Sequence, residues 1–115
     1  MNENTNEQQR DKKFLGLLGL CRKSRQVRLG TQDVCKAARD GKAKLVLVAA
    51  DASANTVEKL TASCKRYCLS PLFLHFTKST LGTAVGISEV SCAAVTDEGL
   101  ASALSGMMSV PETEV

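Results

Sequence analysis

Residues 45–50 read L-V-L-V-A-A, the longest unbroken apolar run in this chain of 115 residues. A run without alternating polar residues is typical of a strand that is covered on both faces. It is far too short to cross a bilayer, so no membrane partner is expected. Because a strand covered on both faces needs a layer on each side, this stretch predicts a sheet held between helices.

Helical patterns lie on both sides of this strand in the sequence. Before it, Phe14, Leu17, Leu18 and Cys21 recur at helical spacing. Further along, strands and helices alternate, which predicts an α/β fold, a three-layer α/β/α sandwich. Thr31 is expected to cap the second helix. The expected helices are 12–23, 31–40, 57–68, 79–86 and 98–104, and the expected strands are 26–29, 45–50, 72–76 and 91–96.

The two ends of the chain differ from this pattern. Residues 1–10 are rich in Asn, Glu and Gln and show neither an apolar period nor the layout of a signal peptide. We therefore expect a disordered tail over 1–10, one folded domain over 11–106, and a C-terminal tail over 107–115.

The five cysteines form no C-x-x-C pair, and the chain has only one histidine. Neither a zinc site nor a disulfide framework has this spacing. We expect free, mostly buried thiols, as in a protein of the reducing cytoplasm. The cysteines are Cys21, Cys35, Cys64, Cys68 and Cys92.

Catalytic motifs are missing from the sequence. It contains no phosphate-binding or dinucleotide-binding glycine motif, its acids are scattered, and His75 lies in an apolar segment. We therefore predict a protein that is not an enzyme and that uses no cofactor and no small-molecule substrate. The G-x-x-x-G of Gly82 and Gly86 is attributed to close helix packing. The three phenylalanines are expected in the core, with Tyr67 as the one exposed ring.

The positive charge is concentrated in one part of the chain. Eleven of the fifteen Lys and Arg residues lie within residues 10–44, together with three acidic residues. Such a distribution favours a polyanionic partner, most often a nucleic acid. The alternative is a solvated basic face that has no partner.

Residues 25–39 read R-Q-V-R-L-G-T-Q-D-V-C-K-A-A-R and contain the main candidate site. Gln32, Asp33 and Lys36 fall on one helix face, beside the free N–H groups of the helix start. A carboxylate can accept from guanine N1–H and N2–H₂, while a lysine can donate to O6 or N7. This chemistry fits guanines in non-Watson–Crick G·A pairs, whose edges are open.

Other cations of the same region are expected to follow the RNA backbone; they are Arg22, Lys23, Arg25, Arg28 and Arg39. A structural interpretation of the stretch stays open. In it, Thr31 caps the helix, Asp33 complements the helix dipole and Lys36 pairs with Asp33.

Four stretches of this chain resemble the YlxQ-like bacterial branch of the ribosomal protein L7Ae/L30e family. They are F-L-G-L-L-G-L-C-R-K-S-R at 14–25, G-K-A-K-L-V-L-V-A-A-D-A-S-A-N-T at 41–56, L-G-T-A-V-G at 81–86 and A-A-V-T-D-E-G at 93–99. The resemblance covers residues 12–104. It implies an α/β/α sandwich with a four-stranded mixed sheet.

The resemblance also implies binding to kink-turn RNA, a bent duplex with tandem sheared G·A pairs. In the family a Gly-x-Asn-Glu segment and a following lysine read the guanines. In this chain Gln replaces Asn and Asp replaces Glu. The amide and the carboxylate are therefore both kept, but each side chain differs in length by one methylene. The matching positions are Gly30, Thr31, Gln32, Asp33 and Lys36.

A second element implied by the resemblance is the loop before the last strand, which packs against the RNA bend. Ile87, Ser88, Glu89 and Val90 occupy it, and Glu89 stands where several relatives carry a basic residue. Ile87 and Val90 are expected to cover unstacked nucleotides or, alternatively, to plug the loop into the core. Two more family contact positions are matched by Val57 and Lys78, for which the equal alternative is an ordinary core valine and an ordinary surface lysine.

The expected function is therefore binding of structured RNA of the kink-turn type, including ribosomal RNA, with ribosomal proteins as further partners. The alternative is a protein-interaction adaptor on the ribosome or an RNA-processing complex, which would use the acidic second half of the chain.

Overall fold

The computed structural model describes residues 3–108, which contain one sheet of four short strands. The strands are β1 (Val27–Leu29), β2 (Leu45–Val48), β3 (Pro71–Phe73) and β4 (Cys92–Val95). Their order is β1-β4-β2-β3, with β2 and β3 parallel and the other neighbours antiparallel. The α/β class and the four-stranded mixed sheet are thereby confirmed.

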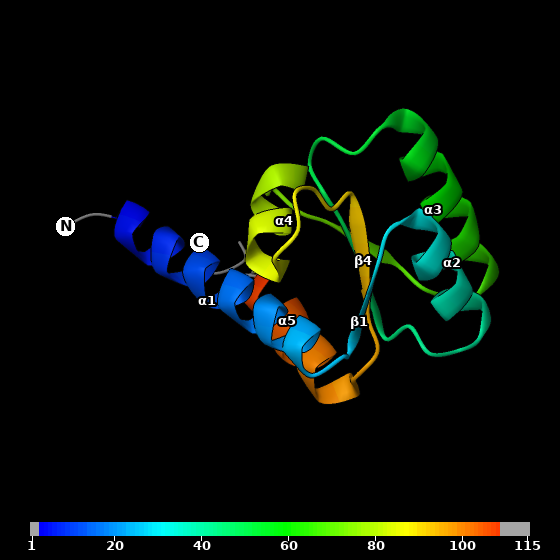
Figure 1. The fold of residues 1–115 in the computed structure, drawn as a ribbon, viewed down its shortest axis with the longest axis horizontal. Helices are drawn as coiled ribbons and strands as arrows, with labels where there is room; N and C mark the ends of the chain where they lie inside the picture. Colours follow the sequence, from blue (N-terminus) through cyan, green and yellow to red (C-terminus); the bar gives the residue numbers. More distant parts are fainter. Residues whose placement is uncertain (1–2, 109–115) are drawn as a thin grey trace.

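Helices cover both faces of the sheet (Figure 1). In the described residues they are α1 (Glu3–Lys23), α2 (Thr31–Arg39), α3 (Ala54–Arg66), α4 (Lys78–Val85) and α5 (Glu98–Met108). α1, α4 and α5 pack on one face and α2 and α3 on the other, which makes the expected three layers.

The burial of β2 on both faces explains why its sequence lacks alternating polar residues. Val46 and Val48 face α2 and α3, while Leu47 faces α1, α4 and α5. Successive side chains of a strand point to opposite faces, and here both faces are covered by helices. All three side chains are 1% exposed or less, so this strand joins the two halves of the core.

The predicted N-terminal tail is wrong for residues 3–10, which lie in α1. Glu7, Gln8 and Gln9 are exposed and need no core of their own. Glu, Gln and Arg lose little side-chain freedom in a helix, and residues 3–10 contain no Pro or Gly. The helix anchored by Phe14 and Leu18 therefore continues towards the N-terminus.

The C-terminal boundary also shifts. Met107 and Met108 were assigned to a tail, but they lie in α5 and pack half-buried against the core. Their apolar side chains extend the last helix beyond the predicted end at Leu104. The rest of the predicted tail, 109–115, and residues 1–2 lie outside the described residues.

Phe73 departs from the expected core position. Its side chain is 57% exposed on β3, an edge strand, whereas Phe14 and Phe76 stack in the core with ring centroids 5.5 Å apart.

β3 ends before His75, whose Nε2 lies 3.1 Å from the Asp11 carboxylate on α1. Among the described helices none is long and apolar enough to cross a membrane.

Candidate nucleic-acid interface

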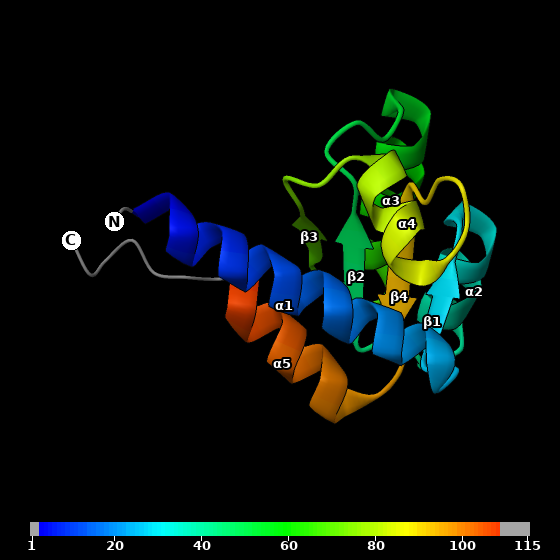
Figure 2. The same cartoon turned by 60° about the vertical axis from the view of Figure 1, so that its left-hand side comes forward.

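Several predicted site residues gather at one end of the sheet, where β1 and β2 end and β4 begins. Gly30 follows β1, and its N–H donates to the carbonyl of Cys92, the first residue of β4, at 3.1 Å. This bond places the start of α2 beside the loop that enters β4, as Figure 2 shows. The start of α2 and the loop at 87–90, about sixty residues apart in sequence, therefore lie side by side.

The opening turn of α2 is built on Gly30, not on Thr31. Gly30 is the N-cap, with φ 93° and ψ 153°, a backbone conformation that is essentially restricted to glycine. The predicted capping role of Thr31 is wrong, since no side chain caps this helix. Thr31 is the first helical residue, and its Oγ1 instead accepts a weak bond from Cys92 Sγ at 3.8 Å.

The missing side-chain cap has a chemical consequence. The first N–H groups of a helix have no partner inside the helix, and they carry the positive end of its dipole. At α2 no serine, threonine or aspartate side chain of the described residues occupies them. These N–H groups can therefore donate hydrogen bonds to an anionic or carbonyl oxygen of a ligand.

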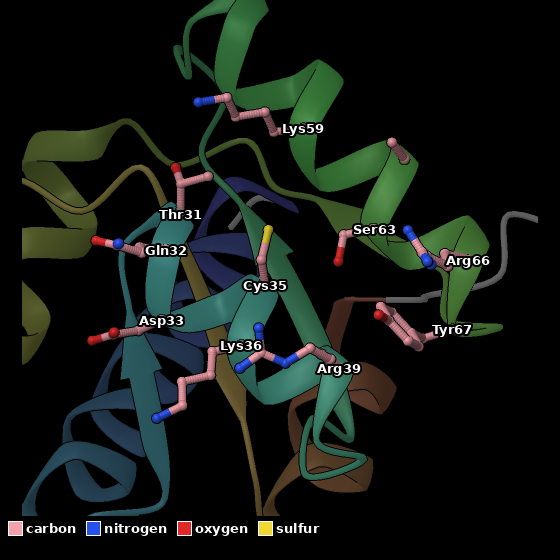
Figure 3. A pocket seen from close by; sticks show the side chains of 11 residues that line it. Thr31, Gln32, Asp33, Cys35, Lys36, Arg39, Lys59, Ser63, Arg66 and Tyr67 are labelled. Carbon is pink, nitrogen blue, oxygen red and sulfur yellow. The ribbon is translucent and has the colours of Figure 1, made fainter.

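The Gln32, Asp33 and Lys36 side chains are all exposed. Figure 3 shows Gln32 and Asp33 pointing the same way, away from α3, with Lys36 extending below Asp33. In the described part of the chain Lys36 forms no ion pair with Asp33, contrary to the structural interpretation. The carboxylate, the amide and the ammonium group are thus available to a ligand.

The remaining predicted cations do not form a ring around this turn. Arg25 precedes β1 with φ 62°, and Arg28 lies within the strand, where its Nη1 donates to the carbonyls of Arg25 (3.3 Å) and Val27 (3.4 Å). Arg39 stands in the last turn of α2 and pairs with Asp40 at 3.4 Å. The cations therefore extend away from Gly30 in two directions, along β1 and along α2.

The loop at 87–90 presents its first three side chains to solvent. Ile87 is 40% exposed, and Ser88 and Glu89 are exposed as well. Val90 is only 3% exposed, so its predicted contact with RNA is wrong and the alternative of a core plug holds for it. Its N–H donates to the carbonyl of Lys78 at 3.0 Å, which draws the side chain into the core.

Gly82 explains the position of this loop. A Cβ at Gly82 would lie 2.7 Å from the Ile87 carbonyl oxygen and 2.6 Å from that of Ser88, closer than van der Waals contact permits. Gly86 ends α4 in the left-handed conformation, with φ 86°. The G-x-x-x-G therefore serves close packing at its first glycine and a helix end at its second.

Val57 and Lys78 lie in the first turns of the two helices that begin near this end of the sheet. Lys78 is half-buried, and its backbone N–H donates to Asp51 Oδ1 at 2.8 Å. Val57 is half-buried and packs against the core under α2 and α3. Their contact with RNA stays a prediction.

An open groove of about 820 Å³ separates α2 from α3 (Figure 3). It starts at the opening turn of α2, and four cations and a single carboxylate line it. Lys59 and Arg66 on α3 were not predicted as site residues. Their spacing of seven places them on one helix face, but the sequence does not show that α3 packs beside α2. The lining residues are Thr31, Gln32, Asp33, Cys35, Lys36, Arg39, Lys59, Ala62, Ser63, Arg66 and Tyr67.

The thiols near this groove are structural. Burial raises the pKa of the Cys92 and Cys64 thiols, so both stay protonated near neutral pH. All five cysteines are free and three of them are buried, which confirms that expectation. The described residues contain no group of three metal-ligating side chains.

Three comparisons relate this chain to known proteins. The sequence profile of the ribosomal protein L7Ae/L30e/S12e/Gadd45 family matches residues 12–105. The RNA-binding protein YlxQ of Bacillus subtilis is 38% identical over 92 residues, which are 80% of this chain and 91% of that protein.

Solved structures share the fold. A Bacillus halodurans protein of unknown function superposes with a TM-score of 0.78 at 33% identity, over 83% of this chain and 95% of its own. The Giardia lamblia 15.5kD RNA-binding protein superposes with a TM-score of 0.72 over 93% of this chain and 87% of its own. At 24% identity this second likeness concerns the fold alone.

Proposed function

Because the chain belongs to the ribosomal protein L7Ae/L30e/S12e/Gadd45 family, we propose that it is an RNA-binding protein that recognises kink-turn RNA. One structural observation carries the proposal: the opening turn of α2 has no side-chain cap and presents Gln32, Asp33 and Lys36 to solvent. The likeness to an RNA-binding relative of Bacillus subtilis supports RNA as the class of ligand.

The opening turn of α2 and the neighbouring loop at 87–90 contact different parts of the RNA. Asp33 accepts from N1–H and N2–H₂ of one guanine of a sheared pair, and Lys36 donates to O6 or N7. Gln32 donates and accepts at a neighbouring base edge, while Gly30 lets the backbone approach. Ile87 lies against the bend of the RNA, with Ser88 and Glu89 beside it.

We further propose that the chain acts by binding alone, without catalysis, in the cytoplasm, and that its RNA is ribosomal. Free thiols support a reducing compartment. Ribosomal proteins would then be neighbours in the same particle.

The experiment that tests this function is a gel shift with two RNAs of equal length. One contains a kink-turn, and in the other the tandem G·A pairs are replaced by Watson–Crick pairs. We expect tight binding to the first and weak, salt-sensitive binding to the second, because a regular duplex hides the guanine edges. Equal affinity would reject kink-turn recognition and favour the adaptor.

Arg28→Ala is expected to weaken binding to both RNAs by a similar factor. A cation that contacts phosphate contributes no sequence information, so its loss lowers the slope of log K against log salt by about 1. The measurement is a salt titration of Kd for each RNA. The control is Lys13→Ala, which removes the same charge from an exposed position on α1. If Arg28→Ala weakens only the kink-turn complex, Arg28 reads a base and the phosphate role is wrong.

A further inference from the structure

We propose that the groove between α2 and α3 binds a single-stranded segment of RNA that continues from the element docked on the opening turn of α2. This inference rests on the proposed function, because it extends the same complex along the protein. The continuity is structural: Thr31, Gln32 and Asp33 of the opening turn lie at the end where the groove begins.

The charge of the groove suits a phosphate backbone. Lys59 and Arg66 are exposed on α3 and form no ion pair among the described residues. Arg39 faces them from α2, and its pair with Asp40 is exposed and therefore weak. The single acid of the lining, Asp33, stands at the end that is assigned to guanine.

The groove also offers a surface on which a base can stack. The Arg66 guanidinium lies over the Tyr67 ring, 5.9 Å from its centroid, and the ring is half-buried. Unpaired bases stack on tyrosine rings and on guanidinium planes. A positively charged groove combined with an aromatic side chain is the usual arrangement for binding single strands.

The occupant is an unpaired segment, not a duplex or a small molecule. Bases inside a duplex are already stacked on one another, so only an unpaired nucleotide can offer a base face to Tyr67. Small-molecule sites have mostly apolar walls with a few polar groups. Here four of the eleven lining residues are cations, and Thr31 and Ser63 add hydrogen-bonding groups.

The test compares six RNAs by gel shift: the kink-turn and its Watson–Crick control, each without a flank, with a short unpaired flank at one end, and with the same flank at the other end. Three proteins are used. They are the wild type, the Lys59→Ala/Arg66→Ala double variant, and a control double variant, Lys13→Ala/Lys65→Ala. Lys65 is the exposed neighbour of Arg66 that does not line the groove, so both variants lose two charges.

A flank at one end is expected to tighten wild-type binding about tenfold, which corresponds to one stacked base with its phosphates. The Lys59→Ala/Arg66→Ala variant should lose this gain, and its salt slope on flanked RNA should fall by about 1.4. The control variant should keep the gain. No gain from either flank, or equal loss in both variants, overturns the groove assignment.

The same data separate the two proposals. The difference between the kink-turn and its Watson–Crick control reports guanine recognition, whereas the difference between flanked and unflanked RNA reports the groove. A gain from the flank that depends on Lys59 and Arg66 without preference for the kink-turn would reject only the guanine readout. A preference for the kink-turn without any gain from the flank would reject only the groove assignment.

Discussion

The Gly82→Ala variant is expected to unfold with a free energy about 1–3 kcal/mol below that of the wild type, the usual cost of overpacking. Its new methyl group would lie 2.6 and 2.7 Å from two backbone carbonyl oxygens of the loop at 87–88. Backbone cannot move aside as a flexible side chain can, so α4 and the loop must separate. Urea denaturation followed by circular dichroism measures the change.

Gly16→Ala is the matched control for this prediction. Gly16 is exposed in α1, and a Cβ there meets nothing within 4 Å. Replacing a helix-interior glycine by alanine stabilises a helix by about 0.5–1 kcal/mol. The two variants should therefore shift the urea midpoint in opposite directions. If Gly82→Ala is neutral or stabilising, the close approach of α4 to the loop is wrong.

The Asp33→Ala variant is expected to weaken kink-turn binding by about 1–3 kcal/mol, or about 5- to 150-fold in Kd. The loss follows from the guanine N1–H and N2–H₂ donors that would be left without an acceptor. On plain duplex the same change should leave Kd unaltered or slightly lower, because it removes a negative charge near phosphate. Titrations of both RNAs at one salt concentration measure the difference.

Asp40→Ala provides the control for charge. Asp40 follows the same helix at its other end, and its carboxylate is engaged with Arg39. Its removal changes the net charge by the same amount without touching the opening turn. Kink-turn affinity should be kept in Asp40→Ala and lost in Asp33→Ala. An equal loss for Asp33→Ala on kink-turn and plain duplex would show that Asp33 reads no guanine.

Local sequence patterns predicted much of the fold because they record which faces of each element meet apolar neighbours. The run at 45–50 required cover on both faces, and Val46, Leu47 and Val48 have it. The spacing of Phe14 and Leu18 placed the buried side of α1 correctly. The prediction of a mixed sheet rested on the family resemblance alone, since the pairing of strands depends on contacts between distant segments.

The opening turn of α2 was also visible in the sequence. A glycine before a helix, followed by exposed polar residues at helical spacing, predicted the shared accessibility of Gln32, Asp33 and Lys36, and all three are exposed. The N-cap was predicted at Thr31, one residue after the actual N-cap, Gly30. The φ of Gly30 is a property of the folded turn, which bonds to Cys92 on β4.

The order of amino acids sets the identity and spacing of the groups on each element, because helix and strand periods are local properties of the backbone. Which elements meet is settled by the packing of the folded chain. This packing buries Val90, leaves Phe73 exposed at a sheet edge, and brings Lys59 and Arg66 of α3 opposite Arg39 of α2. These outcomes depend on packing between segments far apart in the chain, and no local pattern of charge or hydrophobicity records such packing.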